Sequence, residues 1–570
     1  MFSIIFLLAA VLRLFGLSQP YQQDEYKWAQ AADAASHAAQ TIPHPPLALF
    51  LYHHIGSVIG YENLRVVPVF FSLILLIFLF LYLKSFFSMR AALIGALLFA
   101  ATPYALLGSL QIDIDGVFLP LAALATFSGY SLWQRAKNRG EKKWGLVLMC
   151  MSLVIGFGFK LSFILVPAAF VLDLLFHNRQ ARAFLNRREV LVGVAVSAVI
   201  LVGALAVVWN YIGFLRYVDN FVALHGRDYF EILFLTVKGV IYLSPPLFFG
   251  LLLGLLDKKI RKELSLWYFF LLANILFYFV IFDFSHRTFD RYLLFLVLPA
   301  CVATAVWLER VLADVSRAKQ NPLAAYLFGV FIALGSVAWY LALLPHNIIP
   351  LLPKTAFVSA VVHGHWRFLL PMTGGSGPLG FYLPVDVLAL LWALAALGAF
   401  LVLLPLSLSA TLRHKKLGLA FLLSGGALYS LLVGSEYLFG ALYGSSGAVV
   451  SSLMQEIDKI NTKEYQGSTL VRTSGIITYN DVGAYELYAR SLYAGRFYPH
   501  DQFVEGNRVK FAAHPGYYLF VNMPALSTTS VYAKYFAQCR LVAGKQSGHI
   551  AGYLYDCAMA DSQIITLLAR

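Results

Sequence analysis

The sequence is poor in charged residues: Asp, Glu, Lys and Arg make up only 13% of its 570 positions. Hydrophobic residues make up 60%, and the mean hydropathy is +0.72. A water-soluble globule needs more charge than this to cover its surface, so the scarcity excludes that class for most of the chain. Apolar runs of about twenty residues, the length that a helix needs to cross a bilayer, indicate a polytopic helical membrane protein instead.

Cysteine is also scarce, with four residues in the chain. Cys150 and Cys301 fall within apolar runs and are expected to be packing residues. Cys539 and Cys557 are available to form a disulfide in an oxidising compartment, and the sequence leaves open whether they do. The first apolar run lacks a basic n-region and a small-residue cleavage site, which favours a retained membrane helix over a signal peptide.

The basic residues are grouped in a way that excludes a nucleic-acid partner. The formal net charge is +14, but Lys and Arg lie in short clusters between the apolar runs, as cytoplasmic anchors do. These clusters comprise Lys84 and Arg90; Arg135, Lys137, Arg139, Lys142 and Lys143; Arg179, Arg182, Arg187 and Arg188; Lys258, Lys259, Arg261 and Lys262; Arg310, Arg317 and Lys319; and Arg413, Lys415 and Lys416.

The apolar runs predict about thirteen membrane helices. They are expected at roughly 2–17, 64–83, 91–108, 116–132, 145–158, 161–176, 190–211, 237–256, 266–283, 292–308, 321–343, 385–407 and 417–440. Because the basic clusters occupy alternate connections, the positive-inside rule places those connections and the N-terminus in the cytoplasm. An odd number of spans then places the C-terminus outside.

The composition changes at about residue 441, where polar residues, Gly and Tyr become frequent. The alternating stretches Ser468–Arg472 and Tyr517–Val521 predict short strands, and Val449–Ile460 predicts an amphipathic helix. Residues 441–570 are therefore expected to form a small extracytoplasmic α/β domain after a membrane domain of residues 1–440.

The first outer loop carries an unusual set of ionisable residues. Asp24 and Glu25 follow the first apolar run by several residues, and His44 stands before the prolines Pro45 and Pro46. Ionisable groups at a membrane surface are candidates for function. The acidic pair also suits a solvated loop or the first turn of a helix, here one expected from about residue 24 to residue 39.

Further ionisable groups fall on the same predicted face. Asp113 and Asp115 lie in the second outer loop, Lys160 lies in a tight turn between two spans, and Arg287 and Arg291 flank another turn. Each has a structural alternative: a wet helix end for the aspartates, a lysine that snorkels to the interface, and an interfacial anchor for the arginines.

Taken together, these residues suit a reaction between a hydroxyl nucleophile and a phosphate leaving group. The hydroxyl needs a carboxylate to take its proton, which calls for Asp24 or a neighbour as general base. The departing phosphate needs its charge met, which calls for Lys160, Arg287, Arg291, His44 or a divalent cation.

A metal ion stays an open question at this stage. Asp24, Glu25 and Asp115 are the carboxylates that would converge on a divalent cation, but no spacing in the chain is a metal signature.

The order of these motifs resembles the GT-C membrane glycosyltransferases. It comprises Asp-Glu in the first outer loop, His44-Pro-Pro-Leu47, an acidic second loop, the turn Gly158–Ser162, and Arg291-Tyr-Leu-Leu294 before Pro299. The protein O-mannosyltransferases and the bacterial aminoarabinose transferases that modify lipid A are the most similar. The motifs cover roughly residues 1–310.

The resemblance implies transfer of a sugar from a polyprenyl-phosphate carrier to a hydroxyl of a lipid, glycan or protein on the outer face, with inversion at the anomeric carbon. It assigns the base or acceptor-positioning role to Asp24, with Glu25 beside it, and the second acidic position to Asp115 or to Asp113. His44 and Lys160 take positions expected to face the phosphate.

Two departures from the family pattern bear on these expectations. Ser109 and Leu110 stand where the mannosyltransferases usually have an arginine, which leaves the choice between the two loop aspartates open. No large binding module is inserted, which favours an enzyme of the prokaryotic plasma membrane over a eukaryotic one.

Two other classes of protein fit part of the pattern. A transporter or flippase of lipid-linked sugars would place its charges at mid-span on broken helices and often shows repeated halves, whereas no internal repeat is found here. A non-catalytic scaffold would present its C-terminal domain to an outer partner and leave the carboxylates without a role.

Overall fold

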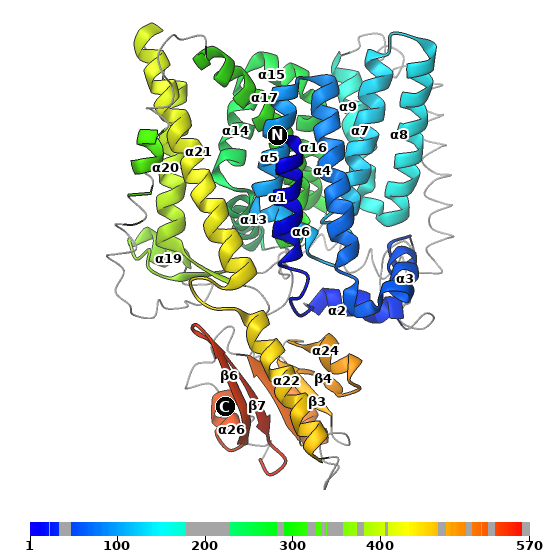
Figure 1. Ribbon diagram of the computed structural model, residues 1–570, viewed down its shortest axis with the longest axis vertical. Coiled ribbons are helices and arrows are strands. Elements are labelled where there is room, and N and C mark those ends of the chain that lie inside the picture. Colours follow the sequence, from blue (N-terminus) through cyan, green and yellow to red (C-terminus); the bar gives the residue numbers. More distant parts are fainter. Residues whose placement is uncertain are drawn as a thin grey trace. The chain divides into compact units, whose positions relative to one another are not determined.

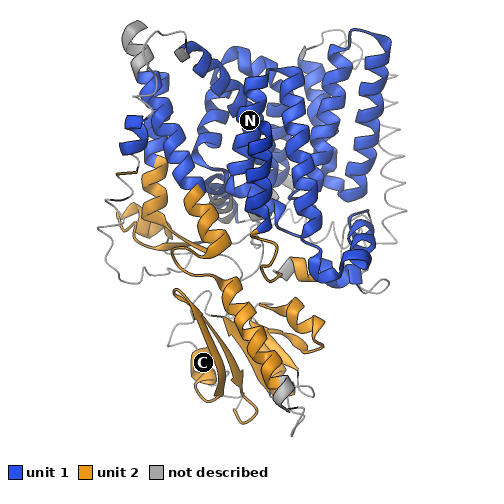
Figure 2. Ribbon diagram, in the orientation of Figure 1, with its two compact units in different colours: residues 1–14, 28–333, 393–430 blue, residues 15–27, 334–392, 431–570 orange. Residues whose placement is uncertain are grey.

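In the computed structural model, the described part of the chain falls into segments separated by short gaps and one long one. These are residues 1–21, 23–33, 47–177, 228–281, 290–316, 327–332, 334–335, 338, 357–372, 381–404, 408–464, 475–479, 482–497, 504–514, 516–521 and 531–560. They group into two compact units, shown in Figure 2. Unit 1 comprises residues 1–14, 28–333 and 393–430, and unit 2 comprises residues 15–27, 334–392 and 431–570.

Unit 1 is a bundle of apolar helices (Figure 1). Its main elements are α1 (Phe2–Leu14), α3 (Leu47–Ile59), α4 (Val66–Phe86), α5 (Met89–Ala101), α6 (Pro103–Ser109), α7 (Phe118–Arg135), α8 (Arg139–Phe159), α9 (Leu165–His177), α13 (Tyr229–Leu243), α14 (Pro245–Leu256), α15 (Lys258–Glu263), α16 (Ser265–Leu276) and α17 (Val297–Ser316). α2 (Gln23–Asp33), α20 (Val385–Leu403) and α21 (Leu408–Phe439) each contribute to both units.

Five helices of the described residues are long and apolar enough to cross a membrane, or six if the bent pair α5 and α6 counts as one span. They are Tyr61–Phe86, Arg139–Phe159, Leu293–Asp314, Val385–Leu403 and His414–Phe439. Five shorter apolar helices accompany them. The polytopic membrane character is thus confirmed, while the count of thirteen stays a prediction, since the expected span at 190–211 and most of that at 321–343 lie outside the described residues.

Two of the expected spans are not continuous helices, and proline is the reason in both. At Pro103 the chain bends by 66° between α5 and α6, because the residue before a proline is driven out of the helical region; Thr102 has φ −69° and ψ 124°. The span expected at 237–256 is divided into α13 and α14 at Ser244, which precedes two prolines and has φ 77°.

Glycine allows neighbouring helices of unit 1 to approach closely. A Cβ on Gly129 of α7 would lie 2.7 Å from the carbonyl oxygen of Gly145 on α8, and a Cβ on Gly398 of α20 would lie 2.5 Å from that of Gly418 on α21. Without a hydrophobic drive between helices in lipid, such backbone approach is a main source of packing energy.

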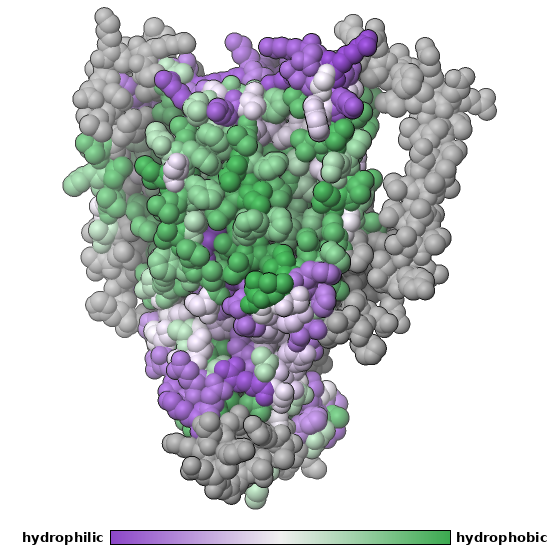
Figure 3. All heavy atoms as spheres, turned by 45° about the vertical axis from the view of Figure 1, so that its right-hand side comes forward, coloured by the Kyte–Doolittle hydropathy of each residue, from purple (hydrophilic) through white to green (hydrophobic). Residues whose placement is uncertain are grey.

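One face of the bundle is largely hydrophobic. Figure 3 shows a broad band of hydrophobic residues over the helices, bordered by hydrophilic residues. In Figure 1, α15 and the connection between α7 and α8, both rich in Lys and Arg, lie at one end of unit 1, and α6 lies towards the other. The bundle thus separates the basic connections from the loop that follows α6.

The first connection contains one predicted helix and one that was not predicted. The surface helix expected at about 24–39 is α2, over Gln23–Asp33, and residues 34–46 lie outside the described part. The second helix is α3, in a stretch that was expected to be loop. At about 1.5 Å per residue its thirteen residues span roughly 20 Å, too short for a full crossing.

The C-terminal part of unit 2 is an α/β domain with a five-stranded mixed sheet in the order β4-β3-β5-β7-β6. β3 (Ile476–Tyr479) runs parallel to β4 (Tyr493–Phe497) and β5 (Tyr517–Val521), and β7 (Ile550–Asp556) runs antiparallel to β5 and to β6 (Arg540–Ser547). The helices are α22 (Ser446–Glu464), α24 (Ala484–Ala489), α25 (Val504–Ala513) and α26 (Val531–Phe536).

Two sequence predictions in this domain are confirmed. The strand at Tyr517–Val521 is β5, and the amphipathic helix at Val449–Ile460 lies within α22. α22 buries Val449, Leu453 and Ile457, spaced four apart on one face, in the same core as the strands. The strand expected at 468–472 lies outside the described residues.

A two-stranded hairpin belongs to the same unit. β1 (Leu369–Met372) pairs antiparallel with β2 (Phe381–Pro384), immediately before α20. Leu369 and Tyr382 are buried in the core that α22 and the sheet form, and the Tyr382 ring packs edge-on against Tyr443 at 5.2 Å. The hairpin is thus held by the C-terminal domain.

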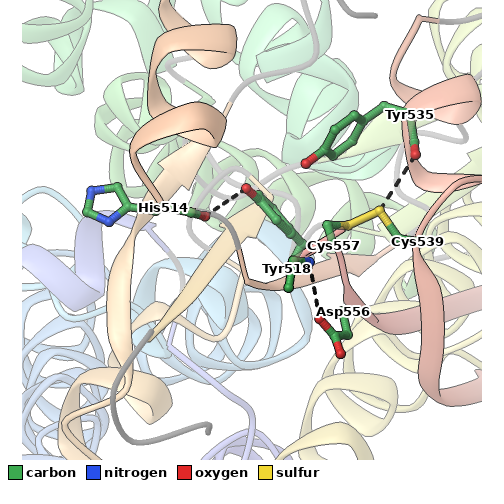
Figure 4. Close-up of a disulfide and its surroundings, with 7 residues drawn as sticks. His514, Tyr518, Tyr535, Cys539, Asp556 and Cys557 are labelled. Carbon is green, nitrogen blue, oxygen red and sulfur yellow. Dashed lines mark hydrogen bonds between the residues drawn. A yellow bond between two sulfur atoms is a disulfide. The ribbon is translucent and has the colours of Figure 1, made fainter. Parts of the chain in front are cut away.

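Cys539 and Cys557 form a disulfide, the point that the sequence left open (Figure 4). The bond ties the turn between α26 and β6 to the residue that follows β7. Close to it, the Tyr518 hydroxyl donates a hydrogen bond of 3.0 Å to the backbone oxygen of His514.

We expect loss of the disulfide to destabilise the C-terminal domain. The bond joins residues 18 apart, and a loop of this length corresponds to about 3 kcal/mol. The double variant Cys539→Ser/Cys557→Ser in the detergent-solubilised full chain should lose protease resistance in its C-terminal domain at a lower urea concentration. Cys150→Ser, which removes an exposed free cysteine, is the control; equal urea midpoints for the double variant and the wild type would contradict the expectation.

Candidate active site

The second loop, between α6 and α7, is built around the Asp113 carboxylate. Its Oδ1 accepts hydrogen bonds from the backbone N–H groups of Asp115 and Gly116, the latter at 3.4 Å. An aspartate that bonds to the backbone two residues further on holds a tight turn. Asp113 is itself buried, with 4% of its surface exposed.

Tyr52 of α3 holds this turn through two hydrogen bonds to the backbone of Asp113. Its fully buried hydroxyl donates to the backbone oxygen of Asp113 at 2.9 Å and accepts from the Asp113 N–H at 3.1 Å. Gly116 completes the turn by lying directly on α6, where a Cβ would be 2.1 Å from the carbonyl oxygen of Gly108. Any side chain at position 116 would push the loop away from α6.

Asp115 and Lys160 form an ion pair that is largely buried. The Lys160 Nζ lies 2.7 Å from Oδ1 and 2.8 Å from Oδ2 of Asp115, with side-chain exposures of 3% for the lysine and 13% for the aspartate. Removing either partner would leave a charge in a poorly solvated place, a change that is strongly destabilising in buried pairs.

The end of α8 directs Lys160 to this position. The helix ends at Phe159, and Lys160 is extended, with φ −159° and ψ 140°, while its N–H still bonds to the Gly156 oxygen at 3.0 Å. A short 3-10 helix, η3 (Leu161–Ile164), starts immediately afterwards. The predicted tight turn at Lys160 is therefore a break between two helices.

A pocket opens beside Asp115 within unit 1. Its polar groups are the side chains of Asp115, Ser162 and Asn274 and the hydroxyl of Tyr278, and the rest of its lining is apolar. The apolar residues of the lining are Leu119, Pro120, Ala123, Phe163, Leu165, Val166, Phe270, Leu294, Phe295 and Leu298. A pocket of this kind suits a ligand with a hydrocarbon part and a polar end.

Asn274 is a polar residue in the last turn of the apolar helix α16. It is 4% exposed, and its Nδ2 donates to the Phe270 oxygen at 2.8 Å. Three residues later the helix widens into a π-helical turn, η4 (Phe277–Ile281). π-turns inside helices often occur at functional sites.

The structure brings together three of the residues that the sequence singled out: Asp113, Asp115 and Lys160. Asp24 lies on α2, but the position of its side chain is outside the described part, and so is that of Arg291 on η5 (Asp290–Leu296).

The remaining predicted residues are placed in different ways. Glu25 is buried, with 3% exposed, rather than solvated in a loop. His44 and Arg287 lie outside the described residues.

Sequence reasoning missed Tyr52 and Asn274. Tyr52 falls in the loop predicted over residues 47–59, which form α3 instead; the apolar run at 47–51 was the signal for this helix. Asn274 is a polar residue within the span expected at 266–283, which is itself a signal. Polar side chains inside membrane spans usually bond to a neighbouring helix or face a cavity.

For a metal ion, the described residues offer no group of three or more His, Cys, Asp or Glu side chains placed to bind one. Because the Asp24 side chain is not among them, the suggested site of Asp24, Glu25 and Asp115 stays a hypothesis.

Comparisons with known proteins agree on the type of protein. The family model of dolichyl-phosphate-mannose-protein mannosyltransferase matches residues 43–209, a stretch that contains the second loop and Lys160. ArnT from Cupriavidus metallidurans bound to undecaprenyl phosphate is 14% identical, with a TM-score of 0.52, covering 97% of each chain. Its apo state is 13% identical, with a TM-score of 0.51 and 98% coverage of each.

A more distant likeness is to the archaeal oligosaccharyltransferase AglB from Archaeoglobus fulgidus, in complex with an inhibitory peptide and a dolichol-phosphate. It is 11% identical, with a TM-score of 0.40, and the match covers 91% of this chain and 69% of that one. No curated protein sequence matches the chain significantly.

The chain is a polytopic membrane protein with the fold of ArnT. The resemblance expected from its motifs, to the GT-C glycosyltransferases of the mannosyltransferase and aminoarabinose-transferase type, is confirmed by the family model and by this fold.

We expect the ion pair to show strong coupling in a double-mutant cycle. Lys160→Met should leave the Asp115 carboxylate buried without its cation and destabilise the protein by about 3–5 kcal/mol. The double variant Asp115→Asn/Lys160→Met should be less destabilised than the two single variants added together. Thermal unfolding of the purified protein in detergent measures this, with Lys143→Met, an exposed lysine on the same α8, as control. Additive effects of the two single changes would contradict a coupled pair.

Proposed function

We propose that this protein is a membrane glycosyltransferase that moves a sugar from a polyprenyl-phosphate carrier to a hydroxyl on the outer face of the membrane. The observation that carries the proposal is that Asp115, which pairs with the buried Lys160, also lines a largely apolar pocket. A polyprenyl-phosphate sugar has the matching chemistry: a hydrocarbon chain, a phosphate and a polar sugar.

In the proposed reaction the acceptor oxygen attacks the anomeric carbon of the sugar from the side opposite the phosphate. The new bond joins the acceptor oxygen to the anomeric carbon, the bond from that carbon to the phosphate oxygen breaks, and the configuration inverts. Asp24 takes the proton of the acceptor hydroxyl as general base, with Glu25 as its neighbour. Polyprenyl phosphate leaves with the electron pair.

The charge of the leaving phosphate is met by the cationic residues of the predicted set. Lys160 is oriented by Asp115, and an ammonium group that is already directed needs little reorganisation when charge develops next to it. Arg287 and Arg291 are further candidates because their positive charge suits a phosphate, and His44 is a candidate from the family resemblance as well.

The two loop aspartates take different roles in this proposal. Asp113 bonds to the backbone of its own loop and supports the turn, while Asp115 lines the pocket and holds the lysine. Asp115 is therefore our choice for the second acidic position of the family.

The proposed location is the plasma membrane of a prokaryote, with the N-terminus in the cytoplasm and the catalytic residues and C-terminal domain outside. The grouping of basic connections at one end of unit 1 supports this orientation. The Cys539–Cys557 disulfide supports an oxidising compartment for the C-terminal domain.

The decisive experiment is transfer by the purified full chain from a panel of polyprenyl-phosphate sugars to lipid, glycan and peptide acceptors, with and without a chelator. Asp24→Asn should lower kcat by about a hundredfold or more, because general-base catalysis contributes that much. Asp33→Asn, an exposed aspartate on the same α2, should transfer as the wild type does.

Each outcome of this experiment has a stated meaning. Unchanged transfer by Asp24→Asn would remove the base role from that residue. No transfer by the wild type with any donor, together with movement of labelled donor between leaflets in vesicles, would favour a transporter. Loss of transfer with chelator, restored by added Mg²⁺ or Mn²⁺, would assign a divalent cation to the reaction.

A further inference from the structure

The segment Phe15–Lys27, which leads into α2, belongs to the same compact unit as the C-terminal domain. Its first attachment is to the end of α21. The Gln19 Nε2 donates to the backbone oxygens of Tyr437 at 3.0 Å and Leu438 at 3.2 Å, and the Phe15 ring packs edge-on against Phe439 at 5.3 Å. The last carbonyls of a helix have no partner within it, so the Gln19 amide satisfies two of them.

The second attachment is to α24 of the C-terminal domain. The Tyr21 N–H donates a hydrogen bond of 3.0 Å to Oε1 of Glu486, across a separation of 465 residues. The Tyr21 ring also packs on Tyr485 at 4.6 Å between centroids, and Tyr21 is 2% exposed. A backbone N–H bonded to a carboxylate is among the stronger hydrogen bonds of a protein.

The third attachment lies just after the start of α2. The Tyr26 ring lies 5.3 Å from that of Tyr493 on β4 and 6.2 Å from that of Tyr488 on α24. Tyr26 is 6% exposed and packs against both of these rings. Asp24 thus lies between two residues, Tyr21 and Tyr26, that both contact the C-terminal domain.

α24 is itself held firmly, so it can serve as a fixed support. Arg490, which follows α24, donates from Nε and Nη2 to the two carboxylate oxygens of Asp458 on α22, at 2.7 and 2.8 Å, and from Nη1 to the Glu486 backbone oxygen at 2.9 Å. These bonds hold the pKa of the Asp458 carboxyl below its ordinary value, so the pair stays ionised at neutral pH.

We propose that the C-terminal α/β domain positions the candidate base, and that Glu486 is the positioning residue through which it acts. The inference rests on the proposed function, in which Asp24 takes the acceptor proton. Glu486 fixes the backbone three residues before Asp24, and the tyrosines on either side keep the start of α2 against the domain. A base that is displaced by about 1 Å can cost on the order of a hundredfold in rate.

The test compares Glu486→Ala with Glu486→Gln in the full chain. The alanine variant removes the acceptor of the Tyr21 N–H, and we expect it to lower kcat about tenfold at unchanged donor KM, because a base out of place slows the chemical step and leaves carrier binding intact. Glutamine keeps an acceptor oxygen and should restore kcat to within about twofold.

Hydrogen exchange provides a readout that does not depend on activity. Peptides covering residues 19–26 should exchange faster in Glu486→Ala than in the wild type. Glu505→Ala is the matched control, since Glu505 is a carboxylate of the same domain that pairs with Arg508 on its own helix. If Glu486→Ala does not fold, Tyr485→Leu, which removes the ring beneath Tyr21, takes its place.

The outcomes separate this inference from the proposed function. Faster exchange together with a lower kcat supports positioning by the domain. Two results overturn it: faster exchange in Glu486→Ala with a kcat equal to that of the wild type, or exchange of residues 19–26 that is unchanged in both Glu486→Ala and Tyr485→Leu. Absence of transfer in the wild type is a failure of the proposed function and is seen before any variant is made.

Discussion

The ion pair between Lys160 and Asp115, surrounded by apolar side chains, constrains how several elements of unit 1 are placed. The charges of Lys160 and Asp115 are tolerated inside the bundle because the two side chains pair at 2.7 Å. This pairing requires the end of α8 and the loop between α6 and α7 to meet. α8 ends at Phe159 so that Lys160 can leave the helix axis, and the second loop turns sharply enough to present Asp115. Tyr52 of α3, which bonds to the loop backbone, and Gly116 of the loop itself, which lies against α6, hold that turn.

The bilayer places the second constraint on the fold. Inside hydrocarbon every backbone group must find a partner within the protein, so irregular chain is tolerated only where neighbours satisfy it. The breaks at Pro103 and Ser244 obey this rule: both lie within unit 1, where Thr102 is 2% and Ser244 3% exposed. The bend after α5 also sets the direction of the short helix α6, against which Gly116 of the second loop packs.

The C-terminal domain has two features that a passive appendage would not need. It binds the segment before α2 through a carboxylate and a group of tyrosines, and it incorporates the hairpin β1–β2 into its own core through Leu369 and Tyr382. Chain from three distant parts of the sequence therefore folds as one unit. The change in composition predicted a domain boundary at residue 440, but composition carries no information about which earlier segments of the chain join the C-terminal domain.

Composition and periodicity alone determined the membrane class, the α/β character of the C-terminal region, the helix at 449–460, and the set of residues to consider, including Asp115 and Lys160. Those properties depend on local hydropathy and on residue type. Tertiary structure decided which of these residues meet. It paired Lys160 with Asp115, turned Asp113 inward to its own loop, closed the Cys539–Cys557 disulfide, and attached Tyr21 to Glu486. Such contacts join residues from 2 to 465 positions apart, and their partners are chosen by the packing of whole elements, which no local pattern records.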